Sequence, residues 1–214
     1  MAALLYSLDL VLVPTTVCLT ALYHVFRWKC IKKRYIATTR GVKEIWIESV
    51  LKENKKKDML GVQSLRNPLM ASILSATVSI LITTGLAALT NNAYRSNYLS
   101  EHRIFGSQGD QIILVKFAMA SFLLLISFFF SSIAIGSIIE ANFLINVSGE
   151  TFNYATERLL KRGWFCASVG NRVLYSTGPF LTWLFGPVPL ALSSALLICF
   201  FYSVDFDQSV ARKK

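Results

Sequence analysis

The sequence predicts an all-α integral membrane protein: a four-helix membrane-spanning bundle with a cytosolic amphipathic helix and a cytosolic cap segment. One observation is composition. The chain has 214 residues, of which 54% are hydrophobic and 16% charged, and its mean hydropathy is +0.50. Soluble domains carry roughly 45–50% apolar and about 25% charged residues. The other observations are the clustering of the apolar residues and the placement of a +10 formal charge.

The apolar residues fall into blocks at about 4–26, 69–89, 112–139 and 181–204. A helix of about 20 residues, rising about 1.5 Å per residue, crosses the ~30 Å hydrocarbon core, and every block reaches that length. The third block is the clearest, because residues 117–139 contain no charge. We therefore expect a single four-span domain over residues 1–214.

The basic residues predict the orientation of these spans. The inner loop at 27–68 holds twelve of them: Arg27, Lys29, Lys32, Lys33, Arg34, Arg40, Lys43, Lys52, Lys55, Lys56, Lys57 and Arg66. Positive residues near span ends stay in the cytosol, whereas the loop after the second span has only Arg95 and Arg103. A second basic loop, 148–178, is also predicted inside. Both termini are then exoplasmic, although the basic tail at 212–214 disagrees.

This placement accounts for the charge excess without a nucleic-acid partner. Lysines beside a bilayer attract anionic lipid headgroups at about 1 kcal/mol each. The expected partners are therefore the lipid bilayer and its anionic lipids. The alternative is that the charges only set the topology.

An amphipathic helix is predicted inside the first inner loop. Its apolar face recurs at three- and four-residue spacing: Val42, Ile45, Trp46, Ser49 and Val50. Trp46, followed by Lys55, Lys56 and Lys57, favours a position in the lipid interface. Packing on a neighbouring subunit or on the second inner loop is the alternative.

The second inner loop leads into the fourth span. Its first part is predicted as a helix, which Gly163, Gly170 and Gly178 are expected to break into a short cytosolic cap. Within span four, the sequence from Gly186 to Pro189 contains two prolines, which predict that the helix kinks or breaks there.

Polar residues in or beside the spans are the candidate functional residues, because an ionisable group in a bilayer must pair or face water. Asp9 and Lys116 are predicted as an outer ion pair. A polar collar is predicted at the cytosolic ends of the spans: His24, Arg66, Asn67, Glu140, Asn142, Asn146 and Arg172. It forms either an anion-attracting vestibule or a structural tie between Arg66 and Glu140. The hydroxyl residues of span two either allow close packing or line a pore.

The sequence contains no signal for catalysis. Glycine-rich phosphate loops, nucleophile elbows and metal-ligand spacings are absent, and His24 and His102 are predicted on opposite sides of the membrane. We therefore expect a protein that is not an enzyme and has no cofactor or bound metal.

The sequence also resembles a known family. The run from Leu60 to Ser72, LGVQSLRNPLMAS, resembles the signature of plant membrane proteins grouped as domain of unknown function 599. The runs 8–14, 142–146 and 183–189 resemble its other motifs. The resemblance covers nearly the whole chain and implies a plant multi-pass protein with four spans. It marks Arg66, Asn67, Asn142 and Asn146 as motif positions without assigning them a role.

The function we expect from these features is that of a homo-oligomeric channel or transport component for an ion or small solute, with a preference for anions. The alternative is a non-conducting scaffold that binds anionic lipid or a cytosolic partner through its basic inner loops.

Overall fold

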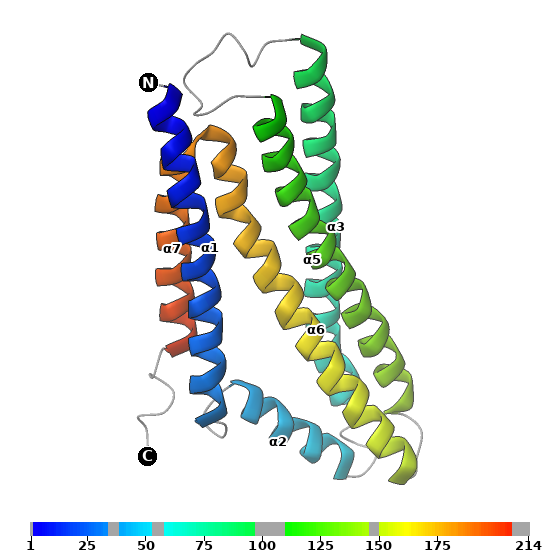
Figure 1. Cartoon of the computed structure of the whole chain (residues 1–214). Helices are drawn as coiled ribbons and strands as arrows, with labels where there is room; N and C mark the ends of the chain where they lie inside the picture. Colours follow the sequence, from blue (N-terminus) through cyan, green and yellow to red (C-terminus); the bar gives the residue numbers. More distant parts are fainter. Residues whose placement is uncertain (1, 34–38, 53–57, 97–109, 146–149, 207–214) are drawn as a thin grey trace. The chain divides into compact units, whose positions relative to one another are not determined.

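The part of the chain that the structure describes is helical except at Ile145 and Gly186 and contains no strand, which confirms the predicted fold class. A computed structural model describes residues 2–33, 39–52, 58–96, 110–145 and 150–206 (Figure 1). The helices are α1 (Ala2–Lys33), α2 (Thr39–Lys52), α3 (Asp58–Ser96), α5 (Asp110–Leu144), α6 (Glu150–Thr182) and α7 (Pro187–Phe206). A 3-10 turn, η3 (Trp183–Phe185), joins α6 to α7.

Four of these helices are long and apolar enough to cross a membrane, as the sequence predicts. The qualifying segments are Asp9–Cys30 in α1, Gly61–Asn92 in α3, Leu114–Leu144 in α5 and Pro187–Asp205 in α7. α3 begins at Asp58, so the end of the predicted inner loop 27–68 is already the first part of that helix.

The prediction that three glycines break the second inner loop is wrong. Gly163, Gly170 and Gly178 all lie inside α6, a continuous helix of 33 residues. Gly163 and Gly170 do not end the helix. They are positions where another helix approaches closely. The predicted cytosolic cap of short pieces is therefore one long helix.

The kink or break predicted at Gly186–Pro189 is observed as a break, and the fourth apolar segment begins after it instead of containing it. Gly186 lies between two helices and has φ 137°, a backbone conformation that favours glycine. Pro187 then begins α7, where a missing backbone N–H does no harm because the first helical residues have no acceptor. The Gly-Pro sequence thus separates α6 from α7 rather than bending one helix.

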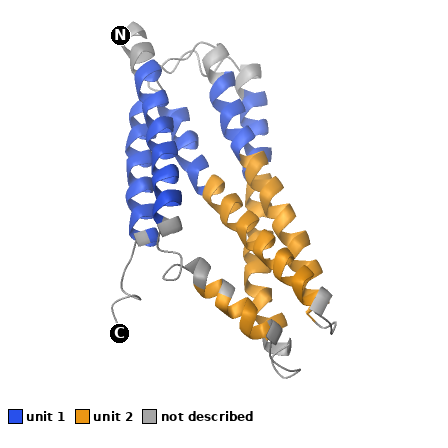
Figure 2. Ribbon diagram, turned by 60° about the horizontal axis from the view of Figure 1, so that its bottom comes forward, with its two compact units in different colours: residues 1–34, 82–123, 175–214 blue, residues 35–81, 124–174 orange. Residues whose placement is uncertain are grey.

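The chain forms two compact units, coloured separately in Figure 2. Unit 1 contains residues 1–34, 82–123 and 175–214, and unit 2 contains residues 35–81 and 124–174. Helices α3, α5 and α6 each contribute to both units. Each unit has its own packing.

In unit 1, α1 and α7 lie side by side and run in the same direction. Asp9, early in α1, bonds to Trp183, just before α7. Tyr23, further along α1, bonds to Asp205 near the end of α7. The earlier residue of α1 contacts the start of α7 and the later residue contacts its end, so the two helices are parallel.

Unit 2 is built on an apolar core that four helices share. The buried members are Ile47, Leu65, Ile138, Ala141, Ile145 and Leu160. Ile47 comes from α2, whose Trp46 packs against Trp164 of α6 with ring centroids 5.6 Å apart. Of the positions left open for α2, the structure shows packing on the second inner segment.

Candidate functional site

A seam of small polar residues joins α3, α5 and α6 in unit 2. Ser75 of α3 donates a hydrogen bond to the Asn171 side chain of α6. Ser79 of α3 donates to Ser127 of α5 at 3.2 Å, and Ser127 donates to the Gly170 carbonyl of α6 at 2.9 Å. These contacts are at the middle of the apolar segments of α3 and α5. The buried serines of α3 therefore serve close helix packing.

Two glycines let α6 approach α5 along this seam. A Cβ added at Gly170 would lie 2.8 Å from Ser131 Oγ and 3.3 Å from the Ser127 carbonyl oxygen. A Cβ added at Gly163 would lie 2.9 Å from Ile138 Cγ1. Position 163 of α6 thus meets residue 138 of α5, and position 170 meets residues 127–131. The two helices are antiparallel.

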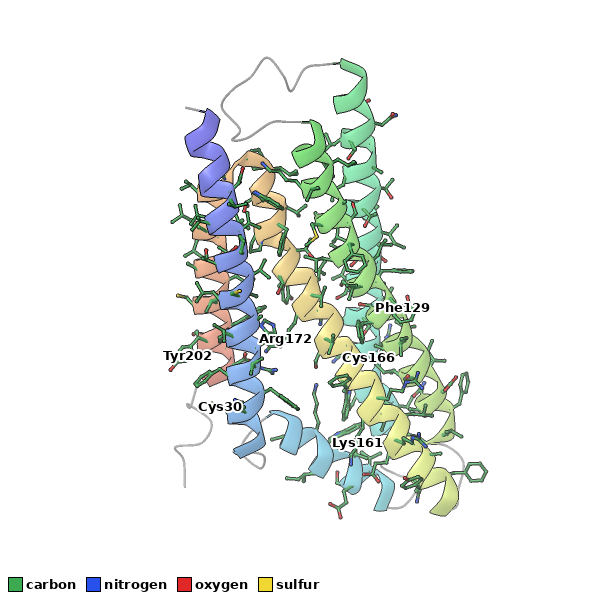
Figure 3. The ribbon with its side chains drawn as sticks, viewed as in Figure 1. Cys30, Phe129, Lys161, Cys166, Arg172 and Tyr202 are labelled. Carbon is green, nitrogen blue, oxygen red and sulfur yellow. The ribbon has the colours of Figure 1, made fainter. Side chains whose placement is uncertain are left out.

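Arg172 follows Gly170 by two positions and so points to the opposite side of α6. At about 100° per residue, this places it roughly 200° from the packed glycine. Figure 3 labels Arg172 on α6 and Phe129 on α5. Arg172 is half-buried, and exposed polar Ser168 lies one turn before it on the same face. A basic residue therefore lies level with the middle of the spans.

This position corrects the predicted polar collar. Arg172 was expected at the cytosolic ends of the spans, beside Arg66 and Glu140. Its neighbours Gly170 and Asn171 instead contact Ser127 and Ser75 in mid-span. The sequence places Arg172 in a cytosolic cap of short helical pieces, whereas the structure has one continuous helix that carries this residue to mid-span.

The other collar residues do not form one cluster in the described part of the chain. Arg66, Asn67 and Glu140 are exposed, and no ion pair joins Arg66 to Glu140 there. Asn142 is half-buried and has an interaction partner. Asn146 lies outside the described residues. His24 belongs to unit 1, whereas the others belong to unit 2.

The structure brings the predicted outer pair together around an indole ring. Lys116 is 2% exposed, and its Nζ lies 5.5 Å from the Trp183 ring centroid. Trp183 Nε1 donates a 3.0 Å hydrogen bond to Asp9 Oδ1, and the Asp9 carboxylate interacts electrostatically with Lys116. Among the described residues, Asp9 Oδ2 has no hydrogen-bond partner. Three segments, α1, α5 and η3, thus meet at one buried charged group.

A second charged cluster at the other end of α1 and α7 was missed in the sequence. Asp205 Oδ2 accepts a 2.7 Å hydrogen bond from the Tyr23 hydroxyl and lies 2.8 Å from Arg27 Nε. The His24 ring packs edge-on against Tyr23 and Phe201. The signal was Asp205 itself, an acidic residue directly after an apolar span, but nothing in the sequence indicated its distant partners.

We expect Asp205→Ala to loosen the contact between α1 and α7. The substitution removes the acceptor of Tyr23 and the counter-charge of Arg27, and hydrogen bonds to charged groups are worth about 1.5–3 kcal/mol. Thermal unfolding in detergent should therefore show a lower midpoint. Tyr23→Phe removes one of the two bonds and should lower the midpoint less. Two variants as stable as the wild type would contradict this.

The lipid-interface residues are described only in part. Lys55, Lys56 and Lys57 lie outside the described residues. In α2, Lys43 Nζ lies 5.2 Å from the Trp164 ring centroid, and burial lowers the pKa of this lysine from its ordinary value of 10.5. The outer face of α2 exposes Val42 and Ile45, each by 60%. α2 thus has one face against the protein and a second apolar stripe outside.

The lowered pKa of Lys43 predicts a rise in stability at alkaline pH. Between the folded pKa and 10.5 the unfolded chain binds the proton more tightly than the folded chain, so the free energy of unfolding increases with pH. Chemical unfolding from neutral pH to about pH 10 measures this rise as the difference between wild type and Lys43→Met. An identical pH dependence in both proteins would exclude Lys43 as its source.

The described residues contain no group of three or more His, Cys, Asp or Glu side chains placed to hold a metal ion. What the structure does contain is four long apolar helices, a polar seam at mid-span and buried charges between helices. These features define a multi-pass integral membrane protein.

Residues 11–210 match the family described as "Protein of unknown function, DUF599", and the chain belongs to this family. The family agrees with the resemblance seen in the sequence, while a plant origin stays a prediction. No curated protein and no solved structure matches the chain.

Proposed function

We propose that the protein is a homo-oligomeric channel or transport component that favours small anions. The observation that carries this proposal is Arg172, a half-buried basic residue that lies level with the middle of the spans, on the side of α6 opposite Gly170. A charged side chain at the bilayer centre costs about 2.5–3.5 kcal/mol on insertion scales, so such residues face protein or water rather than lipid. Rings of Arg or Lys are typical of anion pathways.

Several copies are needed to enclose such a pathway. In unit 2 the face of α6 that carries Gly163 and Gly170 packs on α5, and Ser168 and Arg172 lie on the opposite face, which would line the path. Copies of this face arranged around an axis would supply a ring of guanidinium groups. Mass photometry of the protein in nanodiscs tests the assembly, and a monomer would exclude the shared pathway.

The exposed polar residues at one end of α3 and α5 would form the entrance of this path. Arg66 and Asn67 lie near the start of the apolar segment of α3, and Glu140 lies near the end of that of α5. All three are exposed and therefore accessible to a hydrated ion. Within this proposal, Arg66 attracts an anion and Glu140 limits how long it stays.

Chloride flux into proteoliposomes tests the role of Arg172. We expect Arg172→Ala to reduce flux roughly tenfold or more, because the substitution removes the mid-span charge that stabilises the anion. Arg158→Ala is the matched control: it removes the same charge from an exposed position near the start of α6 and should retain most of the flux. Equal flux in the wild type and Arg172→Ala would refute the proposal.

The second candidate is a non-conducting scaffold on anionic lipid. It is favoured by the exposed Val42 and Ile45 of α2, which precede the lysines at 55–57. A helix with an apolar outer stripe and nearby lysines suits the lipid interface. This function predicts no chloride flux, together with phosphoinositide binding that falls in a variant with Lys55, Lys56 and Lys57 replaced by alanine.

A further inference from the structure

The parallel arrangement of α1 and α7 constrains the number of membrane crossings. Asp9 and Trp183 meet near the beginnings of the two helices, and Tyr23 and Arg27 meet Asp205 near their ends. Both helices contain a segment long and apolar enough to span. Two parallel spanning helices begin on the same side of the membrane and end on the same side.

The chain between these helices must therefore return to the side on which it started. α1 ends on the side opposite its beginning, and α7 must begin where α1 began. An odd number of crossings has to lie between them. α3 and α5 supply two, so one more is required.

α6 has the length and the direction to be that crossing. Its 33 residues extend about 50 Å at ~1.5 Å per residue. The contacts of Gly163 with Ile138 and of Gly170 with Ser131 show that α6 runs antiparallel to α5. Residues 163–182 form a stretch of ~30 Å with a single charge, that of Arg172. In unit 2, α6 therefore runs back toward the side on which α5 began, which is the direction of the crossing that the α1 and α7 pair requires.

We infer that the chain crosses the membrane five times, with α6 as the additional crossing and with the N- and C-termini on opposite sides. The basic residues agree with this topology. The residues at 158–162 stay on the side of the basic α1–α3 connection, and Arg212, Lys213 and Lys214 join that side. The basic tail, which disagreed with four spans, now agrees with the positive-inside rule.

The inference does not depend on conduction. It places Arg172 near the membrane centre and exposes the ends of α6 on opposite sides, whether the protein is a channel or a scaffold. It also makes α6 a membrane-spanning helix. Hydropathy alone does not predict this, because α6 is not among the helices that are apolar enough to count as spans.

Epitope tags on the full-length protein test this topology. One tag precedes Met1 and another follows Lys214, so that no helix is altered, and antibody access is measured in intact and permeabilised cells. Five crossings make only one of the two tags accessible before permeabilisation. Equal access to both tags, or protection of both, would overturn the inference.

Cysteine labelling tests α6 itself. Arg158→Cys and Phe185→Cys place a thiol at exposed positions near the two ends of α6. Both are made in a background in which the native cysteines, Cys18, Cys30, Cys166 and Cys199, are replaced by serine. A membrane-impermeant maleimide should label the two positions from opposite sides. Labelling of both from one side would mean that α6 does not cross. Monodisperse elution of each variant verifies that it is folded.

Discussion

Replacement of Gly170 by leucine is expected to abolish the folded protein, and Gly170→Ala to lower its free energy of unfolding by about 1–3 kcal/mol. A Cβ at this position meets Ser131 Oγ at 2.8 Å, and the backbone atoms Ser127 O and Ser131 N at 3.3 Å. The serine hydroxyl can rotate away, but the backbone cannot. α6 would have to move off α5, and with it the hydrogen bond from Ser127 to the Gly170 carbonyl. Size-exclusion chromatography and thermal unfolding in detergent measure the two effects.

Gly136→Ala is the matched control on the facing helix. Gly136 is exposed on α5, and a Cβ there meets nothing within 4 Å. Alanine also favours a helix over glycine by about 1 kcal/mol, so the unfolding midpoint should stay the same or rise. If both glycines tolerated alanine equally, the close approach at Gly170 would have no energetic importance.

Asp9→Asn is expected to lower the free energy of unfolding by about 3–5 kcal/mol, the range for removing one partner of a buried charged pair. Asparagine can still accept the hydrogen bond from Trp183, so the shape of the site is preserved. What is lost is the negative charge opposite Lys116, which is almost completely buried. Among the described residues, the ammonium then retains the Trp183 ring as its stabilising contact.

The double variant Asp9→Asn with Lys116→Met separates charge from packing. Each single variant leaves one buried charge without its opposite, whereas the double variant leaves neither. We therefore expect the double variant to be more stable than Asp9→Asn alone, by thermal unfolding in the same detergent. Additive losses would show that the two groups do not interact energetically.

Much of the fold was predictable because hydrophobic length is a local property. α1, α3, α5 and α7 each carry their own apolar segment, and no knowledge of their neighbours was needed to place them. α6 was missed because its two signals pointed the wrong way. Arg172 interrupts its apolar stretch, and Gly163 and Gly170 look like helix breakers. A glycine in the sequence is compatible both with the end of a helix and with close packing of a second helix, and the sequence alone does not distinguish the two.

The candidate site was predictable only where charge alone indicated a partner. Asp9 and Lys116 were paired because each is a single ionisable residue near the same end of its span. Trp183, which lies between them, was not foreseen, since an aromatic residue beside a span is common for structural reasons. The Tyr23 and Arg27 partners of Asp205 depend on α1 and α7 being neighbours, which no local pattern records.

The pairing of the first helix with the last has a consequence for biosynthesis. α1 leaves the ribosome first, yet the partners of Asp9, Tyr23 and Arg27 are on η3 and α7 at the end of the chain. Domains fold as their segments emerge, at about 5–20 residues per second, so α1 spends nearly the whole of synthesis without these contacts. The newly made helix therefore carries uncompensated polar groups in the bilayer until translation is almost complete.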